Sequence, residues 1–373
     1  MDLTTIGLSK WDLDTPALCV ELDAFEHNIA TMRSRMAAMQ VASRPHAKSH
    51  KCPAIAARQL AGGSIGICTA KVSEAEVFSA SGIGPILMTT SNVTAHKIRR
   101  AMAIRRANSQ FIQAVDYPQN ARDLDDAARE AGVVADVVVD VAIGTRSGVP
   151  AGEQALALGQ LVDSLPNLTL RGMISYDGSS QHIKGFADRR TYTLTRFEPS
   201  LDTFERFRRA GLSTEIFSGG GTGTYNILPQ ASPHVTDVQA GSYIFMDCQY
   251  LEIGGESNDA RFTDFTPSLT VLTTVLNTYF EGSITTDAGA KALTLNTPGP
   301  LVIGEDTAVY NPSSDEFGVV TCDTARRSYR VGDKLELIPS HCDPVVNLYD
   351  QIYAIRKDRV EAVWPILARG HSQ

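Results

Sequence analysis

The sequence predicts an α/β protein, a TIM-type (β/α)8 barrel that carries a second, mainly β domain. Three observations lead to this prediction. The chain has 373 residues, which is long for a single hydrophobic core. Over residues 23–247, short apolar or β-branched runs alternate with longer amphipathic runs, as they do in βα units. After residue 247 the helical pattern nearly disappears, so we expect the barrel over 23–247 and the β domain over 1–22 and 248–373.

Eight runs in the first part have the composition of barrel strands. They cover residues 41–48, 64–70, 84–90, 110–116, 135–143, 168–177, 214–219 and 235–245. The stretches between them predict helices over residues 51–60, 73–81, 93–107, 118–131, 152–164 and 189–210. Eight such units in a segment of this length match a TIM barrel, and a doubly wound open sheet is the alternative.

The second part of the chain reads as a series of short strands. Strand-like runs cover residues 269–276, 301–303, 318–321 and 334–338, and Gly, Pro, Asn and Asp separate them. Residues 15–22 are also strand-like. We expect them to pair with this domain, which would bring the two ends of the chain together.

Composition excludes several classes of protein. Hydrophobic residues make up 43% and charged residues 20%, as in a globular enzyme, and the formal charge is 34 − 42 = −8. Without a long basic run, binding to nucleic acid or to an anionic membrane is not expected. No apolar run approaches the length of a membrane span, and no secretory signal is visible. The six cysteines show no paired spacing, so we expect reduced thiols in a cytoplasmic protein.

A basic run at residues 44–51, RPHAKSHK, places Lys48 at the end of the first predicted strand. His46, His50 and Lys51 surround it, and like charges together with partial burial favour a neutral amine. A neutral lysine is what a Schiff base with a carbonyl cofactor requires. The alternative is a basic, solvated turn that binds nothing.

A glycine-rich loop, residues 218–224, begins at Ser218 and follows the seventh predicted strand. Its backbone N–H groups could hold a phosphate, and barrel phosphate sites commonly lie there, although such loops are often only flexible. A lysine and a phosphate cradle are the two anchors that pyridoxal phosphate needs. Arg146, after the fifth strand, would contact the cofactor phenolate or the substrate carboxylate. Its alternative is a salt bridge at the barrel rim.

His341 and Asp343 form a second candidate site. They stand two residues apart, so in an extended chain they project to the same side, and Pro339 and Pro344 favour that conformation. Such a pair could hold one divalent cation. Its oxygen donor favours Mn²⁺ or Mg²⁺, whereas a cysteine partner would favour Zn²⁺; Cys342 points the other way and is expected to pack. A His–Asp hydrogen bond without metal is the alternative.

Eight short segments of the sequence are informative when they are taken together. They are residues 14–18, 44–51, 66–68, 71–75, 176–182, 218–223, 239–247 and 341–344. Together they resemble the D-threonine aldolase/D-serine dehydratase family over nearly the whole chain. The resemblance implies an alanine-racemase-like fold, pyridoxal phosphate on the barrel and a homodimer. The ending 363–370 also resembles the aldolases, including those that act on 3-hydroxyaspartate.

The resemblance also implies roles for individual residues. Lys48 would bind pyridoxal phosphate covalently, and the backbone of Gly220, Gly221 and Thr222 would hold its phosphate. His341 and Asp343 would bind a divalent metal beside the cofactor. Dehydratases of the family tend to have His-x-Cys at this position, so the His-x-Asp of this chain favours the aldolase branch.

We therefore expect retro-aldol cleavage of a D-3-hydroxy amino acid, a small-molecule substrate, to glycine and an aldehyde. The metal would bind the 3-hydroxyl and lower its pKa, and His182 would remove the proton, directly or through a metal-bound water. Tyr176 would orient the cofactor or the hydroxyl, and Tyr243 would lie near the cofactor ring. The alternatives are a backbone-bonded loop histidine for His182 and simple packing at the barrel mouth for Tyr176.

Three other functions use similar residues. A dehydratase would use the same lysine and metal but expel the 3-hydroxyl, giving a 2-keto acid and ammonia. A racemase would need a base on each face of the cofactor and no metal. A non-catalytic pyridoxal phosphate carrier usually has the barrel alone, so the β domain and the His341/Asp343 pair argue against it.

Overall fold

The computed structural model describes residues 3–322 and 328–373. The chain divides into two compact units. The barrel unit consists of Met32–Lys48, Ile55–Gly241 and Gly370–Gln373, and the β unit consists of Met1–Thr31, Ser49–Ala54 and Ser242–Arg369. Within the described residues, no helix is long and apolar enough to cross a membrane.

Eight parallel strands form the centre of the barrel unit, in the order β2-β9-β8-β7-β6-β5-β4-β3. Their bounds are β2 Ala42–Ser43, β3 Ile67–Thr69, β4 Ile86–Met88, β5 Phe111–Val115, β6 Ala135–Asp140, β7 Leu168–Ser175, β8 Ile216–Gly219 and β9 Asp237–Val238. A parallel bridge between His46 and Cys68 joins the two ends of this series. The Cys68 N–H also donates to the Pro45 carbonyl at 2.9 Å, so the sheet closes on itself. The predicted barrel is confirmed.

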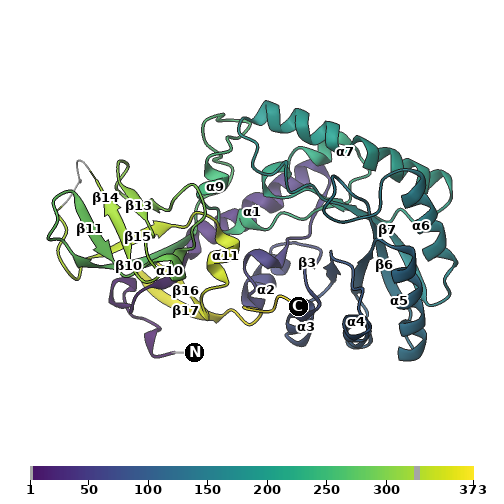
Figure 1. The fold of residues 1–373 in the computed structure, drawn as a ribbon, viewed down its shortest axis with the longest axis horizontal. Coiled ribbons are helices and arrows are strands. Elements are labelled where there is room, and N and C mark those ends of the chain that lie inside the picture. Colours follow the sequence, from purple (N-terminus) through teal and green to yellow (C-terminus); the bar gives the residue numbers. More distant parts are fainter. Residues whose placement is uncertain (1–2, 323–327) are drawn as a thin grey trace. The chain divides into compact units, whose positions relative to one another are not determined.

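Helices flank these strands on the outside, as the dark blue and teal ribbons in Figure 1 show. Their bounds are α2 Pro53–Ala61, α3 Val72–Ala80, α4 Ala95–Ala107, α5 Pro118–Ala131, α6 Glu153–Ser164, α7 Phe186–Arg209 and α8 Leu228–Ala231; α1, Leu22–Met39, precedes them. Local chemistry sets their ends. Pro118 is the first residue of α5, and Gly132 ends it with a φ of 66°.

Two predicted barrel strands are much shorter in the structure. The run 41–48 forms a ladder only at Ala42–Ser43, and Pro45, which has no N–H to donate, prevents its regular extension. Lys48 consequently lies in a 3₁₀ turn, Ala47–Ser49, and not at the end of a strand. The last strand, predicted over 235–245, is limited to β9 because its partner β2 is only two residues long.

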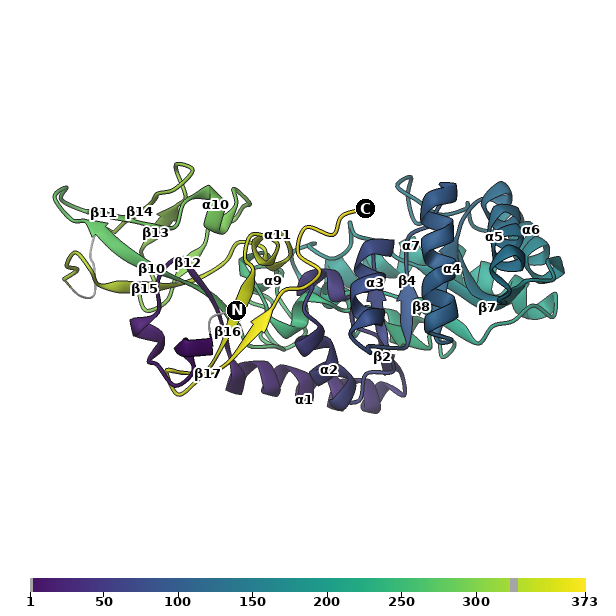
Figure 2. The ribbon, with the colours of Figure 1, turned by 90° about the horizontal axis from the view of Figure 1, so that it is seen from below.

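The β unit is a nine-stranded sheet in the part of the chain that the structure describes. Its strands are β1 Ala17–Glu21, β10 Leu269–Asn277, β11 Ser283–Thr286, β12 Leu301–Val302, β13 Val309–Asn311, β14 Gly318–Thr321, β15 Lys334–Ile338, β16 Gln351–Arg356 and β17 Arg359–Pro365. Figure 2 shows β11, β13 and β14 grouped together. β1 pairs antiparallel with β10 and parallel with β16, which confirms that the N-terminal strand joins this sheet.

Short helices and a buried ion-pair cluster complete the β unit. The helices are α9 Cys248–Leu251, α10 Ala290–Leu293 and α11 Cys342–Val346. Lys10 is nearly buried, and its Nζ donates to Glu21 at 2.8 Å and to Glu336 at 3.0 Å. These contacts hold the segment before β1 against the sheet, because leaving the buried Lys10 charge unpaired would be costly.

Candidate active site

Four of the loops that carry predicted site residues follow parallel strands β2, β6, β7 and β8 at their C-terminal ends, so they meet at one face of the barrel. Lys48 lies in the turn after β2 and is half-buried. Its backbone N–H donates to Nδ1 of His46 at 3.4 Å, and Nε2 of His46 lies 3.2 Å from Oγ1 of Thr89. The backbone that carries Lys48 is thus fixed to the loop after β4.

The glycine-rich loop follows β8 directly. Gly220 has a φ of 67°, which favours glycine, and the loop is buried. A Cβ atom on Gly221 would lie 2.6 Å from Oε1 of Gln181 and 3.3 Å from the ring of Tyr176. A side chain at Gly221 would collide with Gln181, so the close contact between this loop and the segment after β7 requires glycine at this position.

Gln181 holds this loop in shape. Its Nε2 donates to the carbonyl of Asp177 at 3.0 Å and to Oγ1 of Thr224 at 3.1 Å. Its Oε1 accepts the Gly223 N–H at 3.1 Å, and Oγ1 of Thr224 accepts the Gly221 N–H at the same distance. One buried amide therefore links the segment after β7 to the segment after β8.

Arg189 is a second link between the same two segments. It lies in the first turn of α7 and is completely buried. Its Nε donates to the Gly223 carbonyl at 2.7 Å, and its Nη1 donates to the Ile183 carbonyl at 2.8 Å. Sequence reasoning missed this residue, because one arginine among several in a basic helix gives no signal of its own.

Ser218 points into a polar network inside the barrel. Its hydroxyl donates to the carboxylate of Asp237, and it accepts from Nε2 of Gln239 at 3.0 Å. Nε of Arg44 donates to the same Asp237 oxygen at 3.0 Å. All four side chains are buried, so the Ser218 hydroxyl is used to hold β8 against β9.

Tyr176 and Arg146 lie together, although they come from different loops. The guanidinium carbon of Arg146 is 5.4 Å from the centre of the Tyr176 ring, a cation–π contact. Arg146 is exposed, between β6 and α6. Asp140 ends β6 beneath it. Burial, and then the nearby charge of Asp116, raise the pKa of Asp140 to about 7, while Ser147 and Arg146 act in the opposite direction.

His182 and Tyr243 have different surroundings. His182 is exposed, between Gln181 and the Ile183 carbonyl that Arg189 binds. Tyr243 lies in a 3₁₀ turn of the β unit, Ser242–Ile244, and is almost completely buried. Its ring centre is 5.4 Å from that of Phe265. The proposed contacts of His182 with substrate and of Tyr243 with cofactor stay predictions.

The predicted metal-binding segment gathers three donor residues. One ligand atom each from Asp247, His341 and Cys342 lie within 4.8 Å of one another. Nδ1 of His341 is 2.9 Å from Oδ2 of Asp247, a side chain with no exposed surface. Asp343 lies next to this group, since its Oδ1 accepts from Sγ of Cys342 at 3.5 Å.

The conformation of this segment differs from the prediction. His341 is extended, but helix α11 begins at Cys342, so Asp343 lies in its first turn. Pro344 permits this because the first N–H groups of a helix have no partner within it. Burial, together with Asp247 and Asp343, raises the pKa of the Cys342 thiol well above its usual value, which supports a packing role for Cys342.

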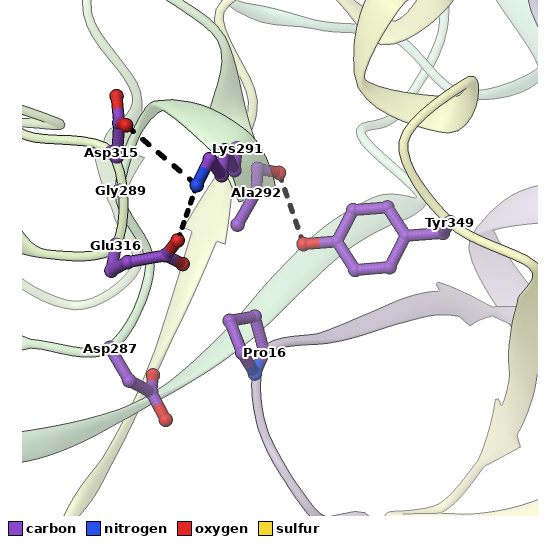
Figure 3. A pocket seen from close by; sticks show the side chains of 8 residues that line it. All are labelled: Pro16, Asp287, Gly289, Lys291, Ala292, Asp315, Glu316 and Tyr349. Atoms are coloured by element: carbon purple, nitrogen blue, oxygen red, sulfur yellow. Dashed lines mark hydrogen bonds and ion pairs between the residues drawn. The ribbon is translucent and has the colours of Figure 1, made fainter.

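The β unit also has a cavity of about 190 Å³, shown in Figure 3. Lys291 at its edge is paired with Glu316 at 2.6 Å and with Asp315 at 3.7 Å, and the Tyr349 hydroxyl donates to the Ala292 carbonyl at 3.0 Å. None of the predicted site residues lines it. We therefore do not place the active site there.

Comparison with known proteins agrees with the fold and with the motifs. The family model of the alanine racemase N-terminal domain matches residues 20–249, and a serine dehydratase domain model matches residues 268–355. The chain is 36% identical to the D-threonine aldolase of Arthrobacter sp over 362 residues, 97% of this chain and 94% of the relative. It belongs to the D-threonine aldolase/D-serine dehydratase family.

Other members of this family are similar over nearly their whole length. The 3-hydroxy-D-aspartate aldolase of Paracoccus denitrificans is 34% identical over 98% of this chain and 94% of its own. The crystal structure of D-threonine aldolase from Filomicrobium marinum superposes with a TM-score of 0.94 at 34% identity, covering 99% of both chains. D-threo-3-hydroxyaspartate dehydratase from Delftia sp. HT23 has a TM-score of 0.83 at 27% identity, covering 96% of this chain and 98% of that one.

Proposed function

We propose that this protein cleaves D-3-hydroxy amino acids to glycine and an aldehyde by a retro-aldol reaction that depends on pyridoxal phosphate and a divalent metal. One observation carries the proposal: the chain is 36% and 34% identical, over at least 97% of its length, to proteins named D-threonine aldolase and 3-hydroxy-D-aspartate aldolase. The His341-Cys342-Asp343 sequence and the two sites built around it and around Lys48 support the same reaction.

The barrel face fits pyridoxal phosphate. Lys48 would bind it through its amine, and the backbone of Gly220, Gly221 and Thr222, in the buried loop that follows β8, would hold its phosphate. When bound, the cofactor supplies an electron sink for a negative charge on the substrate Cα. Ser218, at the start of this loop, supports it through the hydrogen bond that its hydroxyl donates to the Asp237 carboxylate.

Other residues orient the reacting groups. Arg146, held over the Tyr176 ring, binds the cofactor phenolate or the substrate carboxylate. Tyr176, whose ring lies next to Gly221, orients the cofactor or the substrate hydroxyl. We place Tyr243 near the cofactor ring on the family resemblance alone. We assign removal of the 3-hydroxyl proton to His182, an exposed histidine of the loop that follows β7 and contacts the glycine-rich loop.

The β unit supplies the metal site. His341 and Asp343 would hold the ion, and an imidazole with a carboxylate favours Mn²⁺ or Mg²⁺, with Zn²⁺ as the alternative. When bound, such an ion acts as a Lewis acid toward a hydroxyl group. The Asp247 and His341 side chains already lie in hydrogen-bond contact, so the site is partly built without the ion.

A dehydratase is the second candidate function. The similarity to D-threo-3-hydroxyaspartate dehydratase favours it, while the higher identity to the aldolases and the Asp343 side chain argue against it. Incubation with D-threonine, D-phenylserine and D-3-hydroxyaspartate distinguishes the two. Aldol cleavage gives glycine and an aldehyde from each accepted substrate. A 2-keto acid and ammonia in their place would overturn the aldolase proposal.

We also propose that the protein acts as a homodimer in the cytoplasm. Both statements rest on the family resemblance, the unpaired spacing of the cysteines and the composition of the chain. Multi-angle light scattering on the purified holoenzyme measures the first: a mass of twice 40.3 kDa is expected, and a mass of 40.3 kDa would contradict it.

A further inference from the structure

We propose that Asp247 is a positioning residue that fixes the ring of His341 for metal binding. The inference rests on the proposed function, because it concerns the metal that the aldolase reaction would use. Asp247 accepts a hydrogen bond from Nδ1–H of His341, and this leaves Nε2 as the lone-pair nitrogen that faces the ion.

The direction of this hydrogen bond follows from the partners of Asp247. Its Oδ2 lies 2.9 Å from Nδ1 of His341 and also accepts the Cys342 N–H at 2.9 Å. Its Oδ1 accepts the Tyr250 N–H at 3.0 Å. A carboxylate that binds two backbone N–H groups is an acceptor, so the imidazole nitrogen beside it must donate. In a neutral imidazole the other nitrogen, Nε2, is then unprotonated.

The backbone prevents Asp247 from turning away. The segment that starts helix α9 runs beside the segment before α11: the Cys248 N–H donates to the Pro339 carbonyl at 3.1 Å, and the Gln249 N–H donates to the Ser340 carbonyl at 3.1 Å. Asp247 is the N-cap of α9, and His341 is the N-cap of α11. The two caps are therefore held face to face before any ion binds.

A direct ligand role for Asp247 is the competing explanation, since its carboxylate belongs to the group of three potential donors. An ion between Asp247 and Nδ1 would have to break the His341 hydrogen bond. It would also compete with two backbone N–H groups for oxygens that have no exposed surface. A carboxylate behind a metal-binding histidine is a common arrangement, and its loss typically weakens metal affinity about 10–100-fold.

The substitution Asp247→Asn tests the inference with little change in shape. The carboxylate accepts three N–H groups, and the amide has only one oxygen for them, so in either orientation at least one of the three loses its acceptor. The negative charge behind the His341 ring is also removed. Mn²⁺ binding to the holoenzyme, measured by electron paramagnetic resonance of the free ion, should weaken about 10–100-fold. The visible band of lysine-bound pyridoxal phosphate and the melting temperature show whether the variant is folded.

Asp287→Asn is the matched control. Asp287 is another aspartate of the β unit, and it accepts from the Thr274 N–H at 2.9 Å and from the Thr273 hydroxyl at 2.6 Å. Because these partners lie in β10 and not in the segment that carries His341, Asp287→Asn should bind Mn²⁺ as tightly as the wild type does. Equal Mn²⁺ affinity in wild type and Asp247→Asn would overturn the inference.

A second measurement does not need the metal. The ¹⁵N shifts of the His341 ring in metal-free protein should report Nδ1–H in the wild type and a smaller fraction of Nδ1–H in Asp247→Asn, where the carboxylate charge is gone. Nε2–H in the wild type would overturn the inference and favour the direct ligand role. If the wild type shows Nδ1–H but binds no divalent ion, the hydrogen bond between Asp247 and His341 stands. The metal dependence in the proposed function would then be wrong.

Discussion

Nε of Arg189 donates a 2.7 Å hydrogen bond to the carbonyl oxygen of Gly223. The same guanidinium also donates to Ile183, next to His182, so one buried cation holds both the glycine-rich loop and the loop of the proposed base. If the glycine-rich loop holds the cofactor phosphate as proposed, this buried positive charge strengthens anion binding there, because the surrounding dielectric is low.

Arg189→Met should weaken cofactor binding. It removes two hydrogen bonds from a charged donor, each worth about 1.5–3 kcal/mol, so the affinity for pyridoxal phosphate should fall at least about tenfold. Absorbance titration of the apoenzyme with cofactor measures this. The control is Arg190→Met, at an exposed neighbour in α7. If Arg189→Met does not fold, Arg189→Lys replaces it in the same titration. Unchanged affinity in both Arg189 variants would contradict the account.

Lys48→Ala should abolish the visible absorption band of covalently held pyridoxal phosphate, because it removes the amine that would form the Schiff base. Turnover should be lost with it. Lys97→Ala, in helix α4, should keep both properties. A visible band in Lys48→Ala that borohydride bleaches, with the cofactor left covalently attached, would place the cofactor on another lysine.

His182→Gln should lower kcat about 10²–10⁴-fold, the usual contribution of a general base, while the cofactor band remains. The glutamine keeps a polar side chain of similar size but does not accept a proton near neutral pH. His96→Gln, at an exposed histidine of α4, is the comparison. A kcat of His182→Gln that is less than about threefold below the wild-type value would favour the alternative, a loop histidine without a catalytic role.

Asp140 should make the protein less stable as the pH rises. Its folded pKa is about 7, above the unfolded value of about 3.9, so the native state keeps a proton that the unfolded chain has already lost. Stability from this group is therefore present below about pH 4 and is lost as the pH rises to about 7. Asp140→Asn removes this pH-dependent loss. Its free energy of unfolding should therefore exceed that of the wild type by roughly 4 kcal/mol at pH 8.

Urea unfolding at pH 5 and pH 8 measures this difference. Asp163→Asn, at an exposed aspartate of α6, is the matched control for the change in net charge. A difference in unfolding free energy between Asp140→Asn and wild type that is the same at both pH values would contradict the raised pKa of Asp140 as its cause.

The sequence predicted those elements whose ends carry local signals. Helix α5 matches its predicted bounds because Pro118 begins it and Gly132 ends it. Strand β15 matches because its alternating run lies between turn residues. Strands β16 and β17 were not predicted, because charged residues such as Arg356 and Arg359 interrupt their apolar pattern.

The site was only partly predictable for a related reason. The lysine, glycine and histidine motifs are local in sequence and could be found by spacing. Arg189 binds a carbonyl 34 residues away, and Asp247 binds an N–H 95 residues away. Backbone partners carry no sequence signal of their own, so the role of each of these two residues is visible only in the folded chain.

The central claim is that the Cα–Cβ bond breaks, and the reaction of D-threonine in D₂O tests it most directly. Retro-aldol cleavage keeps the substrate Cα–H and adds one deuteron from solvent, so NMR should show monodeuterated glycine and acetaldehyde in equal amounts. Dehydration would give 2-ketobutyrate and ammonia, and racemisation would give Cα-deuterated threonine. Either of these as the main product, without glycine, would contradict the account.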